Sequence, residues 1–451
     1  MTDTGRVAIT IREGRNAWQG KGRCAAPAAA IPATRQETAA CGYRPAAAAA
    51  AIHPQERKGP ASMPGRDLTN PRAPTDGPPM VHRRTPVKRE ALMLMSPAGP
   101  GRTPEEILVA ARAVLDPALR AAVGRLPEPL RGFAEFHYGW AGSGSAVPEG
   151  SLSRLRMPTL VLLSADVNGD GWEGAVEAAA AWSLMGNHTL IHDDIMDRDS
   201  HRRGRPTLWT AFGTAAALQT GNALLALAIE LLSELSGPKI PAAIGLMGRT
   251  VQIMGAGQVA DMDLEERTDV ALEESMAVVE AKACRVMSYA CELGGLCAGA
   301  ADDQIEALSA YGHHLGIACQ LQDDLEDLRP TANWADGVHG SDIRRRKKTP
   351  MLLAALRAQG AGRDRLADLY RSATPLSDIQ IRQAAELVES CGGCGWALRT
   401  IEEHMDLAAQ SLDRARPTPR VHRELAAFAS VFGCPVTGDD HALPESVPVC
   451  G

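Results

Sequence analysis

The sequence has few aromatic residues and no long uninterrupted apolar run. Aromatic residues make up 4% of the 451 residues, whereas hydrophobic residues make up 45%. This balance, with its many alanines, favours tightly packed helices over sheets. No apolar run approaches the roughly 20 residues of a membrane-spanning helix, and the N-terminus lacks the apolar core of a signal peptide. The ten cysteines are scattered, which is typical of a reduced compartment. We therefore expect a cytoplasmic protein without a membrane span.

Acidic residues are scarce in residues 1–102, which carry 16 Lys/Arg and 7 Asp/Glu, a net charge of +9. The rest of the chain carries −16, and the overall charge of −7 argues against a nucleic-acid-binding protein. Residues 1–102 are rich in Pro, Ala, Gly and Arg, so they cannot bury enough apolar surface to offset their ordering entropy. We expect them to be disordered. The alternatives to a functional tail are a dispensable leader, a translation start further downstream and a transit peptide.

Helical periodicity begins after Arg102. Thr103 is a good N-cap, followed by Pro104 and two acidic residues, which predicts a helix to about Val123. A short helix follows Pro129, then a Gly/Ser loop over 139–150. Further helices are expected at 158–168, 172–198, 207–235, 239–266, 271–299, 302–329, 348–359, 362–373, 376–391, 394–414 and 419–433. No convincing alternating strand is found. The pattern predicts an all-α bundle around a central cavity over 103–435, with a flexible tail at 436–451.

Two acid-rich motifs stand out within the predicted helices. Each has the pattern DDxxD, which places three carboxylates on one helix face. The first comprises Asp193, Asp194 and Asp197, and the second comprises Asp323, Asp324 and Asp327. Like charges at this spacing repel one another, so the clusters require a cationic partner. One such motif is readily explained as a solvated helix face, but two are not.

Arginines beside the first motif indicate what the cation serves. Arg202, Arg203 and Arg205 supply forked donors suited to phosphate oxygens. Mg²⁺ takes few carboxylates and usually shares its coordination shell with substrate phosphates. The sequence therefore predicts a diphosphate held between facing helices by Mg²⁺ ions, which would make it a good leaving group.

The ordered set of motifs resembles the trans-isoprenyl diphosphate synthase (polyprenyl synthetase) family over about residues 103–433. The segments that carry the likeness are His192–Asp197 with Arg202–Gly204, Gly257–Asp261, Lys282, Gly312–Asp324 and Ser341–Pro350. The resemblance implies the all-α isoprenoid-synthase fold, a prenyltransferase activity and a homodimer. It also implies three Mg²⁺ ions bound by the six aspartates of the two motifs.

Individual roles follow from the resemblance as well. Arg202, Lys282, Gln320 and Lys347 would contact the allylic diphosphate. Arg203 and Arg156 would serve the second substrate, isopentenyl diphosphate. The residues implied in catalysis itself are Asp193, Asp194, Lys282, Gln320 and Asp323. His188 and Thr189, just before the first motif, would set product length, and we expect a C15–C20 product.

The sequence departs from the family pattern in the half of the site that binds isopentenyl diphosphate. Ser153 stands where a Lys is expected, and Gly186 stands where a His is expected. Losing both donors would weaken this pocket, since charge-assisted hydrogen bonds contribute about 1.5–3 kcal/mol each. A terpene cyclase, which ionises an allylic diphosphate without isopentenyl diphosphate, is therefore the alternative function. A partner-dependent, non-enzymatic subunit is disfavoured because six metal-type aspartates are retained.

Two N-terminal features suggest a partner. The segments 89–95 and 136–140 resemble actinobacterial polyprenyl transferases that are carried as cargo inside encapsulin shells. By this resemblance, residues 1–102 would be a loading tail, and the enzyme would lie within an encapsulin compartment of the cytoplasm.

Overall fold

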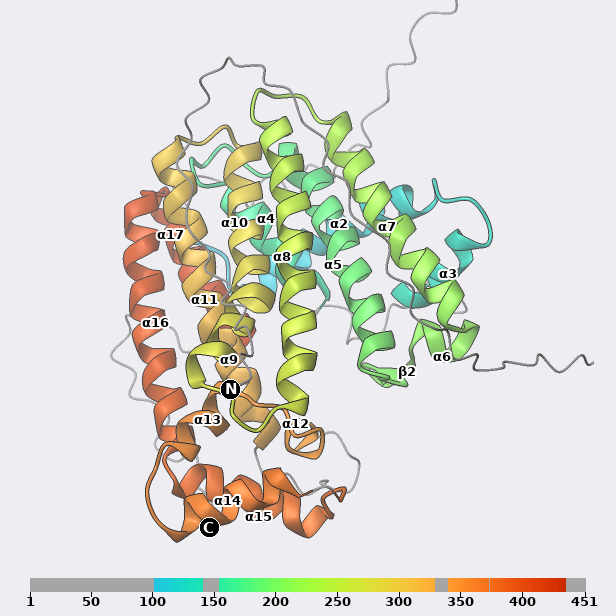
Figure 1. Cartoon of the computed structure of the whole chain (residues 1–451). Coiled ribbons are helices and arrows are strands. Elements are labelled where there is room, and N and C mark those ends of the chain that lie inside the picture. The colour runs from blue at the N-terminus through green and yellow to red at the C-terminus, as the bar shows by residue number, and fades with distance from the viewer. Residues whose placement is uncertain (1–100, 141–153, 329–339, 373, 435–451) are drawn as a thin grey trace, which may run out of the picture. The chain divides into compact units, whose positions relative to one another are not determined.

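A computed structural model describes residues 101–140, 154–328, 340–372 and 374–434, which form an almost wholly helical structure (Figure 1). These residues all belong to the second of two units into which the chain divides, His82–Gly451. The all-α class is therefore confirmed. The predicted leader, except Gly101 and Arg102, and the predicted tail lie outside the described residues.

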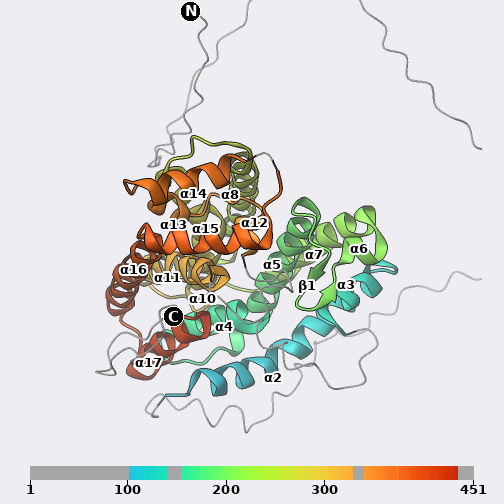
Figure 2. The same cartoon turned by 90° about the horizontal axis from the view of Figure 1, so that it is seen from below.

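The long helices run roughly alongside one another, and the shorter helices α12–α15 gather at one end (Figures 1 and 2). In chain order the elements are α2 (Pro104–Val123), α3 (Leu130–Tyr138), α4 (Arg156–Ala165), η2 (Glu173–Ala175), α5 (Val176–Met196), β1 (His201–Arg202), β2 (Arg205–Pro206), α6 (Leu208–Phe212), α7 (Thr214–Glu234), α8 (Ile240–Glu266), α9 (Leu272–Val279), η3 (Glu280–Cys284), α10 (Arg285–Cys297), α11 (Asp302–Leu328), α12 (Ser341–Arg344), α13 (Pro350–Leu356), α14 (Ala361–Arg371), α15 (Asp378–Ser390), α16 (Gly393–Ala415), α17 (Pro419–Phe428) and η5 (Ala429–Phe432).

Most predicted helices are present; a four-residue helix that was not predicted, α12, is added, and there are three further local differences. The first helix has the expected bounds and begins with a capping box between Thr103 and Glu106. The span 207–235 breaks at Gly213, whose φ of 86° is outside the helical range. The span 271–299 contains a single π-helical turn, η3. Residues 201–206 form a small antiparallel hairpin where no strand was predicted, because a two-residue pair is too short to show alternation.

α5 lies near the centre of the structure, as its nearly continuous apolar sequence predicts. It packs along α7 and contacts α4, α2 and α10. By length and composition alone α7 is long and apolar enough to cross a membrane, yet one side of it is packed on α5. The absence of a membrane span remains a prediction.

Two glycines allow α11 to approach η3 and α10 closely. A Cβ atom at Gly312 would lie 2.6 Å from the Met287 carbonyl oxygen, and one at Gly316 would lie 2.6 Å from Cys284 Cα. Real side chains do not approach backbone so closely, so both positions require glycine. This close packing holds the part of α11 just before the second acid motif. Gln320 lies one turn after Gly316, and Asp323 follows it.

A buried ionic network joins the start of α2 to α4 and α17. Arg420 is 1% exposed and pairs with Asp166 at 2.7 Å and with Glu424 at 2.9 Å. Glu424 also accepts two hydrogen bonds from the Arg102 guanidinium, at 2.9 and 2.7 Å, and one from its backbone N–H. Two arginines therefore neutralise two carboxylates that water does not reach.

Replacing Arg420 with methionine tests this network. We expect Arg420→Met to lower the free energy of unfolding by about 3–5 kcal/mol, because it leaves buried carboxylates without a partner. Urea denaturation followed by circular dichroism measures the loss. The control is Arg112→Met, which removes a half-exposed pair with Asp116 on α2 and should cost much less. Equal losses in the two variants would contradict the interpretation.

Candidate active site

The first acid motif closes α5. Asp193 and Asp194 lie in its last turn, and Asp197 is the C-cap residue that follows its end at Met196. Asp194 is buried and accepts a 2.6 Å hydrogen bond from Arg202 Nε. Asp197 accepts a 3.2 Å hydrogen bond from the amide of Gln258 on α8. Two of the three carboxylates are thus held in place by neighbouring elements.

The Asp193 carboxyl lies in surroundings that disfavour its negative charge. Burial raises its pKa to about 6; Lys282 opposes the shift, whereas the charge of Asp197 adds to it. Lys282 lies on η3 and forms a 2.6 Å ion pair with Asp261 of α8. Single π-helical turns occur frequently at functional sites, and this one brings a lysine near acidic residues of two other helices.

The second acid motif lies near the end of α11. Asp324 is buried; its Oδ1 accepts a 2.9 Å hydrogen bond from Gln320, and its Oδ2 has no hydrogen-bond partner among the described residues. Burial raises the pKa of Asp324 to about 8, with a further rise from Asp342. Burial likewise raises the pKa of Asp323 to about 6. Burial therefore makes the ionised form of both carboxyls less favourable than it is in water.

The segment Ser341–Lys347 bridges the two motifs. At its start, Asp327 Oδ1 and Oδ2 accept hydrogen bonds from the backbone N–H groups of Ser341 and Asp342, at 3.1 and 3.2 Å. Further along, Arg345 pairs with Asp197 at 3.2 Å. One short segment therefore contacts the acid residues of both α5 and α11.

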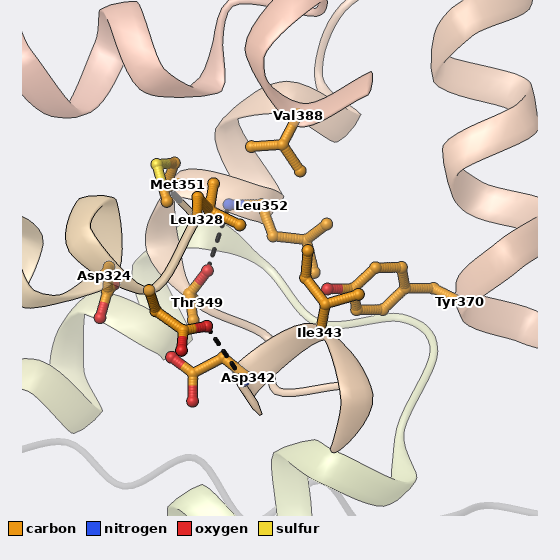
Figure 3. A pocket seen from close by; sticks show the side chains of 10 residues that line it. Asp324, Leu328, Asp342, Ile343, Thr349, Met351, Leu352, Tyr370 and Val388 are labelled. Atoms are coloured by element: carbon orange, nitrogen blue, oxygen red, sulfur yellow. Dashed lines mark hydrogen bonds between the residues drawn. The ribbon is translucent and has the colours of Figure 1, made fainter. Parts of the chain in front are cut away.

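Lys347 lies in the same acidic surroundings. Burial alone would lower its pKa, but attraction to Asp342, Asp261 and Asp197 raises it, so Lys347 is charged. Figure 3 shows Asp324 and Asp342 among the residues that line a small pocket next to this segment. Other residues lining this pocket are Leu328, Ile343, Leu352, Tyr370 and Val388.

The arginines after the first motif do different things. Arg203 and Gly204 form the turn of the β1–β2 hairpin, with φ values of 52° and 71°. Arg202 faces the first motif, as described above. Arg205 instead donates a 3.0 Å hydrogen bond to the carbonyl of Phe136 on α3 and lies over its ring. Arg205, predicted as a phosphate ligand, therefore holds α3 against the hairpin.

Positive charge gathers between the hairpin and the start of α4. Desolvation lowers the pKa of Arg203 to about 10, and repulsion by Arg154, Arg202 and Arg156 lowers it further. Arg156 also lowers the pKa of Asp323, so it lies between this cluster and the second motif. Arginines this close to one another favour binding of a multiply charged anion.

The two predicted chain-length residues lie on different sides of α5. His188 is buried, and its ring packs edge-on against His192 with centroids 4.4 Å apart, beside α7. Thr189 precedes Asp193 by one helical turn, so it shares the face of that carboxylate. Its hydroxyl donates a 2.8 Å hydrogen bond to the Gly186 carbonyl.

The donor set fits Mg²⁺ with a substrate phosphate. Among the described residues no three ligand side chains converge closely enough to hold a metal ion by themselves. Raised carboxyl pKa values and the unpartnered Asp324 oxygen nevertheless indicate a missing positive charge. Mg²⁺ is commonly held by one or two carboxylates together with phosphate oxygens, which reconciles these observations.

Sequence reasoning missed Arg345 and Asp342. Arg345 belongs to an unbroken run of five basic residues, 344–348, and a run gives no means of choosing the member that contacts the first motif. Asp342 carries no motif of its own. Ser153, the predicted departure before α4, lies outside the described residues.

Comparison with known proteins places the chain among prenyl diphosphate synthases. The polyprenyl synthetase family model matches residues 150–388. The (2E,6E)-farnesyl diphosphate synthase of Mycobacterium tuberculosis is 35% identical over 326 residues, 72% of this chain and 91% of that protein. A polyprenyl synthetase structure from Streptomyces coelicolor A3(2) aligns with a TM-score of 0.67 and 32% identity, over 72% of this chain and 98% of that one.

A third relative was solved with ligands. The geranylgeranyl pyrophosphate synthase of Corynebacterium glutamicum, complexed with calcium and isoprenyl diphosphate, aligns with a TM-score of 0.59 and 25% identity. The alignment covers 72% of this chain and 95% of that one.

The raised pKa of Asp324 predicts a pH-dependent stability in metal-free protein. An unfolded chain ionises this carboxyl near pH 4, whereas the folded protein keeps it protonated to about pH 8. Stability is therefore lost as pH rises between these values. We expect Asp324→Asn to raise the melting temperature in EDTA at pH 8 and to change it little at pH 5. The exposed control Asp368→Asn should show no such difference, and equal shifts of Asp324→Asn at both pH values would contradict the assignment.

Proposed function

The chain belongs to the polyprenyl synthetase family, and from this we propose that it is a magnesium-dependent prenyltransferase that condenses an allylic diphosphate with isopentenyl diphosphate. One observation carries the proposal: segment 341–347 contacts acid residues of both DDxxD motifs, which makes them one site. The alternative, a terpene cyclase, is not favoured, because the matched relatives are named as synthases.

Each acid motif has a place in this reaction. Asp193, Asp194 and Asp197 would bind Mg²⁺ beneath the allylic diphosphate. The remaining ligands would be Asp323, Asp324 and Asp327, and we propose three ions in all. When bound, Mg²⁺ neutralises the charge that develops on the departing diphosphate.

Basic and amide side chains would hold the allylic diphosphate. Arg202, Lys282, Gln320 and Lys347 take this role, and Arg345 joins them because it already contacts Asp197. Their charges stabilise the diphosphate as its C–O bond breaks. The double bond of isopentenyl diphosphate then attacks the allylic cation, and the released pyrophosphate accepts the proton that is lost. Arg203 and Arg156 would bind the diphosphate of this second substrate.

Partners and location complete the proposal. Apolar residues remain exposed on α7 and α8, and we propose that a second copy covers them in a homodimer. These residues are Leu218, Ile229, Ile253, Val259 and Met262. We place the enzyme in the cytoplasm. Residues 1–100 lie outside the described residues, and their role in loading an encapsulin shell remains a proposal.

Product analysis tests the activity. Purified protein is incubated with Mg²⁺ and geranyl, farnesyl or geranylgeranyl diphosphate, each with and without isopentenyl diphosphate. We expect a longer prenyl diphosphate that forms only with isopentenyl diphosphate and is lost by at least a hundredfold in Asp193→Asn. A hydrocarbon or alcohol formed without isopentenyl diphosphate would overturn the synthase and establish the cyclase.

Residue size before the first motif tests the control of product length. We propose a C15–C20 product. We expect Thr189→Phe to shorten it by at least one C5 unit, because a ring one turn from Asp193 obstructs the growing chain. His188→Ala should lengthen it. Chromatography of dephosphorylated products measures both, and unchanged product lengths would exclude these residues as length determinants.

A further inference from the structure

The last turn of α3 lies beside the arginine cluster, although no expected site residue comes from this helix. Arg154 donates a hydrogen bond to the carbonyl of Tyr138, and Arg205 donates one to that of Phe136. A Cβ atom at Gly139 would contact the guanidinium groups of both arginines, and it would lie 3.8 Å from a guanidinium nitrogen of Arg154. Cations at the carbonyl end of a helix are favourable, so these arginines fix the turn that carries His137.

The His137 ring is anchored on α5, next to the position where a histidine is missing. Its Nε2 lies 2.8 Å from Asn187 Oδ1. The amide of Asn187 donates through Nδ2 to the Ser183 carbonyl at 2.7 Å, so Oδ1 is the acceptor and Nε2 the donor. Among the described residues the other ring nitrogen, Nδ1, has no hydrogen-bond partner. Gly186 immediately precedes Asn187.

The position of Gly186 itself cannot readily hold a large side chain. A Cβ there would lie 3.1 Å from the Trp182 ring, and Trp182 is buried. A larger residue at 186 would therefore require the indole to shift by a few tenths of an ångström. The Trp182 indole crowds position 186 on α5. The His137 imidazole reaches the neighbouring residue, Asn187, from α3.

The charges around His137 suit a ligand with several negative charges. Burial lowers the pKa of His137 to about 4; the bond to Asn187 opposes this, and Arg154, Arg203 and Arg202 lower it further. A diphosphate would neutralise these arginines and favour the imidazolium, whose Nδ1–H then donates to a phosphate oxygen. The largest charged influences on His137 are these three arginines, not a carboxylate.

We propose that His137, with Arg154, Arg156 and Arg203, binds the diphosphate of isopentenyl diphosphate, its imidazole taking the place of the side chain that Gly186 lacks. This inference rests on the proposed function, which it deepens by assigning the second substrate's site. Arg156 lies toward Asp323 of the second motif, so the bound isopentenyl group would lie near the allylic site.

Steady-state kinetics with both substrates tests the proposal. We expect His137→Ala to raise KM for isopentenyl diphosphate at least tenfold and to leave KM for the allylic diphosphate within twofold. His137→Gln preserves a donor to Asn187 but carries no charge, so a smaller, three- to tenfold rise is expected. The matched control is His422→Ala, which removes an imidazole of α17 that pairs with Asp413 of α16 and should change neither KM.

Direct binding separates this proposal from the proposed function. Isopentenyl diphosphate is titrated calorimetrically into metal-free full-length protein, and circular dichroism verifies that each variant is folded. Wild-type binding weakened at least tenfold in His137→Ala supports the site even if no elongation product forms. Wild-type affinity in both His137 variants, no binding by the wild type, or equal rises of both KM values would overturn it. Elongation with an unchanged KM in His137→Ala would leave the synthase standing without this site.

Discussion

The burial of closely spaced carboxylates is the constraint on which the rest of this structure depends. Six aspartates lie near the ends of α5 and α11, and burial raises the pKa of three of them to between about 6 and 8. A protein selected for stability alone would place neutral residues there, since buried charges without full compensation are costly. The surrounding cations, Lys282, Arg345 and Lys347, offset part of this cost. The remainder is left for metal ions and diphosphate.

The distribution of positive charge divides the site into two parts. Cations paired with aspartates surround the first motif, whereas the arginines between the hairpin and α4 mainly repel one another. Paired cations respond to a metal–phosphate complex by exchanging partners. Mutually repelling arginines gain most from an anion that brings no metal. If the proposed function holds, this difference in charge would distinguish the two substrates before the hydrocarbon part of either is recognised.

Sequence patterns predicted the fold class, the order of the helices and the two motifs, because each depends on local periodicity or on a fixed spacing. They did not predict the hairpin at 201–206, the break at Gly213 or the π-turn, because each is at most a few residues long and its backbone is set by packing. The contacts of Arg205 and Arg345 could not be predicted either. Both have the same side chain, but Arg205 binds a carbonyl of α3 whereas Arg345 pairs with Asp197. His137 is separated from Asn187 by 50 residues, and that contact exists only after α3 docks on α5.

The π-turn at Glu280–Cys284 has a consequence for helical phase. An α-helix advances about 100° per residue, and a π-turn inserts one residue into the repeat. α9 and α10 therefore continue along one axis with their apolar stripes rotated by about 100° relative to each other. Each helix can bury its own apolar stripe, α9 beside α8 and α10 beside α4 and α11. Lys282 lies in the π-turn between the two helices. Deleting one residue from this turn would restore a regular helix and force one stripe to face the wrong neighbour.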